Sequence, residues 1–316
     1  MITQEHTSRR WLKGALSQRA RLVRWGRLAG LAGALVMFLL LFQPERDQRL
    51  VDALWLIALL LWASEIRSRA GGRLLDLELR RADVLPMVVI LPIFAAAWVP
   101  FHDNWRWAYT DDSAGYLGFA RDVAAVGLKQ NLLSVHGVDN NFTVLNSLAF
   151  NVLMYIFGPG FFWHRMGHLL MSLLSLLAIY TYFNVVVGPL WSVVIVLATA
   201  TNYVWLWFSF VSYPHINSFI FYFLPLTFAV LIFRRPERLG IWMLCGVTSG
   251  LALFFTQTAW SGVAAVGLVL VALALSTRRW AALVILGVSF ALAATPLLLQ
   301  IPGLINMAAR QSRSPM

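Results

Sequence analysis

Long runs of apolar residues, separated by short polar and basic segments, dominate the chain from about residue 26 onward. A helix needs roughly 20 mostly apolar residues to cross the hydrocarbon core of a bilayer. Lipid offers backbone groups no hydrogen-bond partners, so such segments form helices. The pattern predicts about nine or ten hydrophobic segments, at roughly 26–43, 50–64, 84–100, 142–158, 163–183, 188–211, 215–233, 240–256, 262–276 and 280–299.

Composition leads to the same fold class. Of the 316 residues, 59% are hydrophobic and only 12% are charged, about half the charged share of a soluble domain. We therefore predict an all-α, polytopic membrane helical bundle that forms a single transmembrane domain over residues 1–316. The one cysteine, Cys245, lies inside an apolar run, which excludes a disulfide within the chain.

The net charge of +11 comes mainly from arginines that cluster between the hydrophobic runs. In that setting they indicate topology, and we expect no nucleic-acid partner. Residues 1–25 form a basic tail that we expect in the cytoplasm. No small-residue cleavage site follows the first apolar run, so we expect a retained helix and not a signal peptide. The basic stretch 65–83 should also be cytoplasmic, which places the 101–141 loop outside the cytoplasm.

Later basic segments conflict with this topology. Arg234 and Arg235 as well as Arg278 and Arg279 should also face the cytoplasm. Four hydrophobic runs lie between the 101–141 loop and Arg234, however, and an even number of crossings would place Arg234 outside. Either one run between 142 and 233 does not cross, or two runs are re-entrant. The sequence leaves open which.

The 101–141 loop has helical periodicity of its own. Thr110 can cap a helix that starts at the acidic pair Asp111-Asp112, because acids in a first turn favour the helix dipole. Asp112 and Tyr116 begin an apolar stripe at helical spacing, whereas Asp111 lies over Gly115 and Gly118. This pattern predicts an amphipathic helix on the membrane surface, with Asp111 above a groove that a ligand could enter.

The acidic pair is the strongest candidate for chemistry in the sequence. A carboxylate held within hydrogen-bond reach of a hydroxyl can act as a general base, and partial burial makes it more basic. Simple helix capping in a solvated loop is the alternative for Asp111 and Asp112. The two acids could also hold a divalent cation, although octahedral Mg²⁺ or Mn²⁺ sites require more oxygen ligands. We expect no other cofactor.

Five further residues are weaker candidates. Arg121 has the fork geometry that matches phosphate oxygens, but a local salt bridge or a lipid headgroup would also explain it. His164 and His168 share a helix face without an evident third metal ligand, so we expect them at the membrane interface. Arg165 fits a boundary anchor. His215 interrupts two apolar runs, where a polar break either lines a cavity or forms a simple loop.

The order of these elements resembles the polytopic type C glycosyltransferases, particularly the protein O-mannosyltransferase and aminoarabinose-transferase group. The similarity covers roughly residues 95–235. It consists of the Asp-Asp loop with Tyr116 and Ala120-Arg121, an apolar run that closes with Phe157-Gly158, and then Arg165, Tyr180 and Gly188. The chain departs from the family in its Asn140-Asn141-Phe142-Thr143 segment, its extra early spans and its shorter length. The length leaves a truncated chain, an inactive chain and a partner-dependent chain as options.

The resemblance implies an inverting transferase in the bacterial inner membrane. It would move a sugar from a polyprenyl-phosphate donor to a lipid, glycan or protein acceptor outside the cytoplasm. Asp111 would be the base, Asp112 its neighbour, and Tyr116, Arg121, Arg165 and His215 would contact substrate. The alternatives are an O-antigen-type polysaccharide polymerase and a non-catalytic transporter, flippase or assembly subunit. A transporter should carry charges deep in several spans and repeat symmetry, which the sequence does not suggest.

Overall fold

The structure is a computed structural model. It describes residues 2–43, 49–70, 81–98, 142–210, 219–255 and 259–311, together with positions 117, 118, 121, 122, 125, 133, 135 and 136 of the 101–141 loop. These residues form eleven helices and one antiparallel pair of two-residue strands, which confirms the all-α prediction. The early elements are α1 (Ile2–Leu41), α2 (Arg49–Arg69), α3 (Arg81–Trp98), β1 (Val135–His136) and β2 (Phe142–Thr143). The later ones are α5 (Val144–Phe157), α6 (Phe161–Val187), α7 (Pro189–Ala200), α8 (Tyr203–Phe210), α10 (Ile220–Arg234), α11 (Leu239–Phe255), α12 (Ala259–Ser276) and α13 (Trp280–Gln311).

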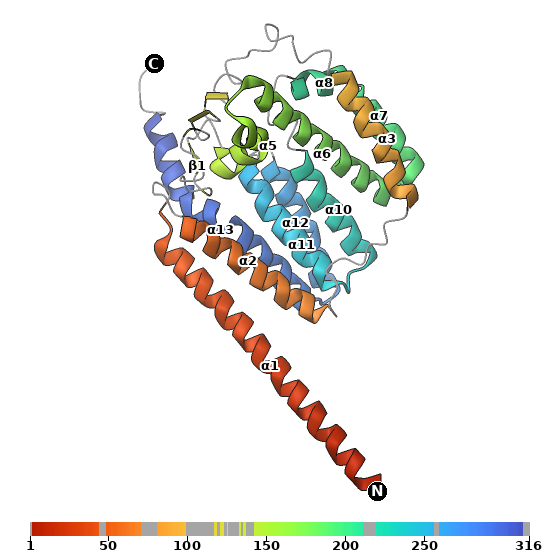
Figure 1. The fold of residues 1–316 in the computed structure, drawn as a ribbon, viewed down its shortest axis with the longest axis vertical. Helices are drawn as coiled ribbons and strands as arrows, with labels where there is room; N and C mark the ends of the chain where they lie inside the picture. The colour runs from red at the N-terminus through yellow and green to blue at the C-terminus, as the bar shows by residue number, and fades with distance from the viewer. Residues whose placement is uncertain are drawn as a thin grey trace.

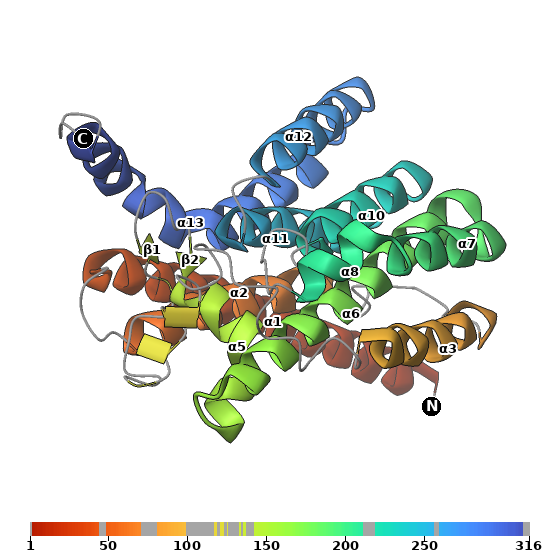
Figure 2. The ribbon, with the colours of Figure 1, turned by 90° about the horizontal axis from the view of Figure 1, so that it is seen from above.

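The helices have the length and composition of an integral membrane protein. Four of them contain stretches that are long and apolar enough to cross a membrane, namely Arg21–Leu41, Phe161–Val187, Ala259–Ser276 and Trp280–Pro302. Shorter apolar stretches lie at Pro86–Ala96, Pro189–Ala200, Ile220–Arg234 and Leu239–Leu253. In Figure 2, α12 and α3 lie at opposite edges of the bundle with α10, α11 and α6 between them.

Two predicted segments differ from the helices observed. The 188–211 run is not one helix, because α7 ends at Ala200 and α8 begins at Tyr203. The side-chain oxygen of Asn202 accepts a hydrogen bond from the backbone N–H of Val204 at 2.8 Å, which caps the new helix start. The basic tail 1–25 also belongs to a helix, since α1 begins at Ile2 and extends away from the other helices (Figure 1).

One end of the bundle, which we call the basic end, is rich in arginine. There α1 and α2 are joined by Glu65, to which Arg24 and Arg69 both pair. Arg234, in the last turn of α10, donates a hydrogen bond to the backbone carbonyl of Val185 near the end of α6. The turns α10–α11 and α12–α13 lie at the same end, because their flanking residues share one buried cluster. The arginines of the basic end are Arg24, Arg27, Arg67, Arg69, Arg234, Arg235, Arg238, Arg278 and Arg279.

The opposite end, which we call the loop end, carries the described residues of the 101–141 loop. Gln300 of α13 donates a hydrogen bond to the carbonyl of Leu133 at 2.8 Å, and Leu133 packs with Phe38 and Val51 where α1 ends and α2 begins. The two ends of the bundle are therefore unlike: one is rich in arginine and made of short turns, and the other holds the long loop.

Close backbone packing fixes the C-terminal half of the bundle. Gly246 and Gly250 are four residues apart in α11 and face α13. A Cβ at Gly246 would lie 2.5 Å from the carbonyl oxygen of Leu286, and one at Gly250 would lie 2.7 Å from that of Phe290. Small residues at this spacing allow two membrane helices to approach closely, which is how they associate without a hydrophobic driving force.

The central helix α6 is tied to its neighbours by serines. Ser172 donates a hydrogen bond to Ser209 of α8 at 2.9 Å, and the hydroxyl of Ser175 accepts one from the backbone N–H of Ile220, at the start of α10, at 3.1 Å. Both serines are buried. Interhelical hydrogen bonds between small hydroxyl side chains are a usual means of fixing helix positions in membranes. The helix that carries the candidate site is therefore held from two sides.

The structure identifies α5 as the run between 142 and 233 that does not cross the bundle. It follows β2 of the loop, its Ala149 packs on Phe255 and Leu297 at the loop end, and its Phe157 stacks on Trp163 at the start of α6. Figure 1 shows α5 nearly end-on, whereas α6, α10 and α11 lie lengthwise. The chain then traverses the bundle three times before Arg234, along α6, then α7 with α8, then α10. An odd number of traverses places Arg234 at the opposite end from the loop, as the arginine pattern requires.

Single-cysteine labelling tests this arrangement. Pro159, Asn202 and Glu237 are exposed in the α5–α6, α7–α8 and α10–α11 turns, and Cys245 is fully buried. We expect Pro159→Cys and Asn202→Cys to react with a membrane-impermeant maleimide from the same side of sealed vesicles. Glu237→Cys should react only after the vesicles are inverted. Labelling of Pro159→Cys from the Glu237 side would mean that α5 crosses.

Candidate functional site

The predicted site residues divide into two groups. Asp111, Asp112, Tyr116 and His215 lie outside the described residues, so their proposed roles stay predictions. Arg121 and Arg165 are described, and both belong to the loop end, where the loop meets the start of α6. The site is therefore built from this junction.

The described part of the loop packs on the α5–α6 junction. Positions 117, 118, 121, 122 and 125 are helical, in agreement with the helix predicted over this stretch. Leu117 is buried against Met154 of α5, in a small cluster that includes Phe161 and Trp163. Arg121 stands one helical turn after Leu117 and is exposed. One turn of helix therefore holds an arginine next to the start of α6.

A cluster of buried polar side chains lies beneath this contact. Asn151 of α5 and His164 of α6 are hydrogen-bonded through the amide oxygen and the imidazole Nδ1. The ring of His168 lies 4.7 Å from that of His164 and 5.0 Å from that of Phe150, measured between centroids. His164 and His168 are each only 1% exposed. The interfacial position expected for these histidines stays a prediction, and within the protein α5 packs over both rings.

A glycine in α6 allows this close contact between α5 and α6. A Cβ at Gly167 would lie 2.1 Å from the carbonyl oxygen of Phe150, so only glycine fits there. The backbone of α5 is also kinked at Asn151, with φ −120° and ψ 21°. The kink turns the Asn151 side chain into the contact with His164. Asn151 is the member of the cluster that sequence reasoning missed, and an asparagine within an otherwise apolar run was the available signal.

Arg165 is an unusual residue for its position. It lies in the first turns of α6 and is 1% exposed, although it was predicted to be a boundary anchor. Its guanidinium carbon lies 4.5 Å from the centre of the Phe161 ring, a cation–π distance. A cation at a helix N-terminus is unfavourable, because that end already carries partial positive charge. Its burial there places a guanidinium group inside the α5–α6 junction.

The charges of Arg121 and Arg165 converge on the histidine pair. Both arginines are near enough to act electrostatically on His164, one from the loop and one from α6. Gly160, the residue before α6, provides no side-chain cap. Two guanidinium groups and a helix N-terminus form an environment that attracts an anion, and phosphate suits it best. In the described residues, no three His, Cys, Asp or Glu side chains lie together as a metal site would require.

Comparison of the chain with protein-family models, with curated proteins and with solved structures gives no match.

Substitution at Gly167 tests whether the α5–α6 contact holds the cluster together. We expect Gly167→Ala to force α5 away from α6 and to lower the free energy of unfolding by about 1–3 kcal/mol, as overpacking does. Thermal unfolding of the purified protein in detergent measures the change. Gly287→Ala is the matched control, since no atom lies within 4 Å of a Cβ at Gly287 in α13. Equal stability of the two variants would contradict the close contact.

Proposed function

We propose that the protein is a membrane glycosyltransferase that moves a sugar from a polyprenyl-phosphate donor to a lipid, glycan or protein acceptor. One observation carries this proposal: the contact of Leu117 with Met154 brings the loop that holds Arg121 to the start of α6, where Arg165 is buried beside the Phe161 ring. A site of this kind, set in a membrane bundle, suits a ligand with a phosphate head and an apolar tail. The resemblance of residues 95–235 to type C glycosyltransferases supports the same chemistry.

In the proposed reaction, Asp111 removes the proton from the acceptor hydroxyl as the hydroxyl oxygen attacks the anomeric carbon of the sugar. The bond from that carbon to the phosphate oxygen breaks, and the electron pair leaves with the polyprenyl phosphate. Negative charge therefore develops on the leaving phosphate, where the guanidinium groups of Arg121 and Arg165 stabilise it. Asp112 positions Asp111, while Tyr116 and His215 contact substrate. The attack inverts the anomeric centre.

We propose that the basic end faces the cytoplasm of a bacterium and that the loop end faces away from it, in the inner membrane. The arginines at one end of the bundle support this orientation, because basic residues are retained on the cytoplasmic side. The three traverses between the loop and Arg234 support it too. The polyprenyl-phosphate donor would then reach the site from the outer leaflet, and ordinary membrane lipids would surround the bundle.

Loss of the proposed base is the first test. We expect Asp111→Asn to lower turnover of a polyprenyl-phosphate sugar by about 10²-fold or more, since general-base catalysis contributes at least that much. Turnover is measured in proteoliposomes at matched protein content. Asp122→Asn is the control, because Asp122 is an exposed carboxylate of the same loop and has no assigned role. Unchanged turnover in Asp111→Asn would refute the base assignment, and donor binding without wild-type turnover would favour a non-catalytic subunit.

Loss of the loop arginine should affect donor binding. We expect Arg121→Gln to weaken binding of the donor about tenfold, as removal of a charge-assisted hydrogen bond does. The binding of the free acceptor should not change. Arg235→Gln, at the basic end, removes the same charge far from the site. If both variants bind the donor equally well, Arg121 is not a phosphate ligand.

A further inference from the structure

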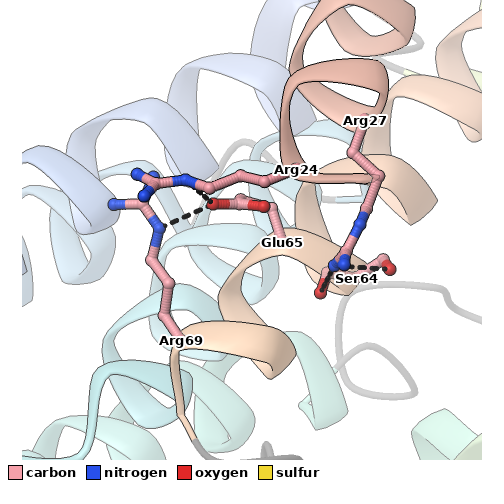
Figure 3. Close-up of polar contacts among 5 residues, drawn as sticks. All are labelled: Arg24, Arg27, Ser64, Glu65 and Arg69. Carbon is pink, nitrogen blue, oxygen red and sulfur yellow. Dashed lines mark hydrogen bonds and ion pairs between the residues drawn. The ribbon is translucent and has the colours of Figure 1, made fainter. Parts of the chain in front are cut away.

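A second cluster of charges lies at the basic end, far from the candidate site, between α1 and α2. Glu65 of α2 is buried, with only 2% of its side chain exposed, although it carries a carboxylate. One of its oxygens, Oε1, accepts contacts from the Nε atoms of two arginines, at 3.1 Å from Arg24 of α1 and at 2.8 Å from Arg69 of α2. Figure 3 shows the two guanidinium groups side by side on the same side of Glu65.

The two arginines share a single oxygen and leave most of their hydrogen-bonding capacity unused. Each reaches Glu65 through Nε, and in the described part of the chain neither makes a further contact through its Nη nitrogens. Their side chains are 55% and 39% exposed, so these nitrogens are accessible. A guanidinium presents its donors as a planar fork that matches phosphate oxygens. The buried carboxylate thus orients two guanidinium groups toward the surface, and its single negative charge does not neutralise both positive charges.

The local charge is strongly positive. Arg27 lies on the same face of the hairpin, one turn after Arg24, and its Nη1 donates to the backbone carbonyl of Ser64 at 3.0 Å (Figure 3). Two guanidinium groups therefore contact one carboxylate, and a third is bonded to the neighbouring residue Ser64. A net cationic group of this kind needs an anion nearby, and like-charged arginines held this closely would otherwise repel each other.

The depth of the cluster in the membrane indicates the source of that anion. The span of α1 begins at Arg21, so Arg24 and Arg27 lie in its first two turns. Arg69 ends α2 at the same level. Arginines at the end of a membrane helix extend their charged groups to the headgroup region, where lipid phosphates lie. A lipid phosphate is therefore the anion available at this depth.

We propose that Arg24 and Arg69, held by Glu65, bind the phosphate of an anionic phospholipid at the basic end of the bundle. The site is separate from the proposed glycosyl transfer and does not depend on it. Its role is to fix the α1–α2 hairpin in the lipid leaflet. Arg27 supplies a further positive charge beside the bound phosphate.

A comparison of two variants separates the effect of losing the arginines from the effect of losing the ion pair. Glu65→Gln abolishes the ion pair and keeps both arginines. The triple variant Arg24→Gln/Glu65→Gln/Arg69→Gln abolishes the ion pair and removes the arginines, without leaving a buried charge unpaired. Binding of phosphatidylglycerol to the full-length protein in neutral-detergent micelles is measured by native mass spectrometry, with phosphatidylcholine as reference. No turnover is read, so failure of the glycosyltransferase proposal does not affect the result.

We expect Glu65→Gln to bind phosphatidylglycerol at least as tightly as the unsubstituted protein, because the glutamine Oε1 still accepts from both arginines and one negative charge is removed. The triple variant should bind it about 30-fold more weakly than Glu65→Gln, since each basic side chain near an anionic headgroup contributes a factor of about five. Arg69→Gln alone, which keeps Arg24 paired with Glu65, should lose about fivefold and provides the test if Glu65→Gln does not fold. Phosphatidylcholine retention should be the same in all variants.

Three results would overturn the proposal. The triple variant could bind phosphatidylglycerol as tightly as Glu65→Gln. Arg278→Gln/Arg279→Gln, which removes two arginines from another turn at the same end, could lose as much affinity as the triple variant, which would mean that total charge and not the pair binds lipid. Inorganic phosphate at millimolar concentration could displace the lipid fully, which would make free phosphate the ligand of the site.

Discussion

The inability of hydrocarbon to solvate polar groups governs how this chain folds. Each charged side chain has to reach a membrane surface or find a partner inside the protein. The arginines of the basic end meet the first requirement, because they lie in turns or near helix ends. The buried polar side chains meet the second. Glu65 is paired with arginines, Asn151 with His164, and Ser172 with Ser209.

Close helix contacts allow these internal partners to form. The Asn151–His164 contact exists because Gly167 lets the backbone of α5 approach α6. At the other side of the bundle, Gly246 and Gly250 bring α11 against α13, and α13 in turn receives the indole N–H groups of Trp55 and Trp62 from α2. Close helix packing and the pairing of buried polar groups therefore depend on the same glycines. A side chain larger than hydrogen at these positions would separate the polar partners as well as the helices.

Much of the fold could be predicted from the sequence, because an apolar run in lipid has few alternatives to forming a helix. The break at Asn202 and the course of α5 could not. Both depend on contacts with other helices: Asn202 caps α8 within a run that is apolar on either side, and α5 is as apolar as a spanning helix but is kinked at Asn151. Arginine counting showed that one run had to be exceptional, and only packing identified it.

The site was harder to predict from the sequence than the fold. Arg121 and Arg165 were candidates for separate reasons, one from a loop helix and one from a helix start, and no spacing in the sequence connects them. The contact of Leu117 with Met154 brings the loop to α6. His164 and His168 were expected at the interface because the sequence shows no third metal ligand beside them. Their burial follows from the non-crossing α5, which had no signature in the sequence.

The position of α5 also explains why a site can exist at the loop end at all. A spanning helix at this place would have continued the apolar wall of the bundle and exposed its sides to lipid. Because α5 instead stays at the loop end, the buried polar groups of α6 are covered by protein and border the loop, not the hydrocarbon. Arg165 can then be buried next to a helix N-terminus, an arrangement that is unfavourable for a cation in isolation and that would favour the phosphate of the proposed donor. The position of α5 and the buried polar cluster of α6 are thus consequences of the same packing.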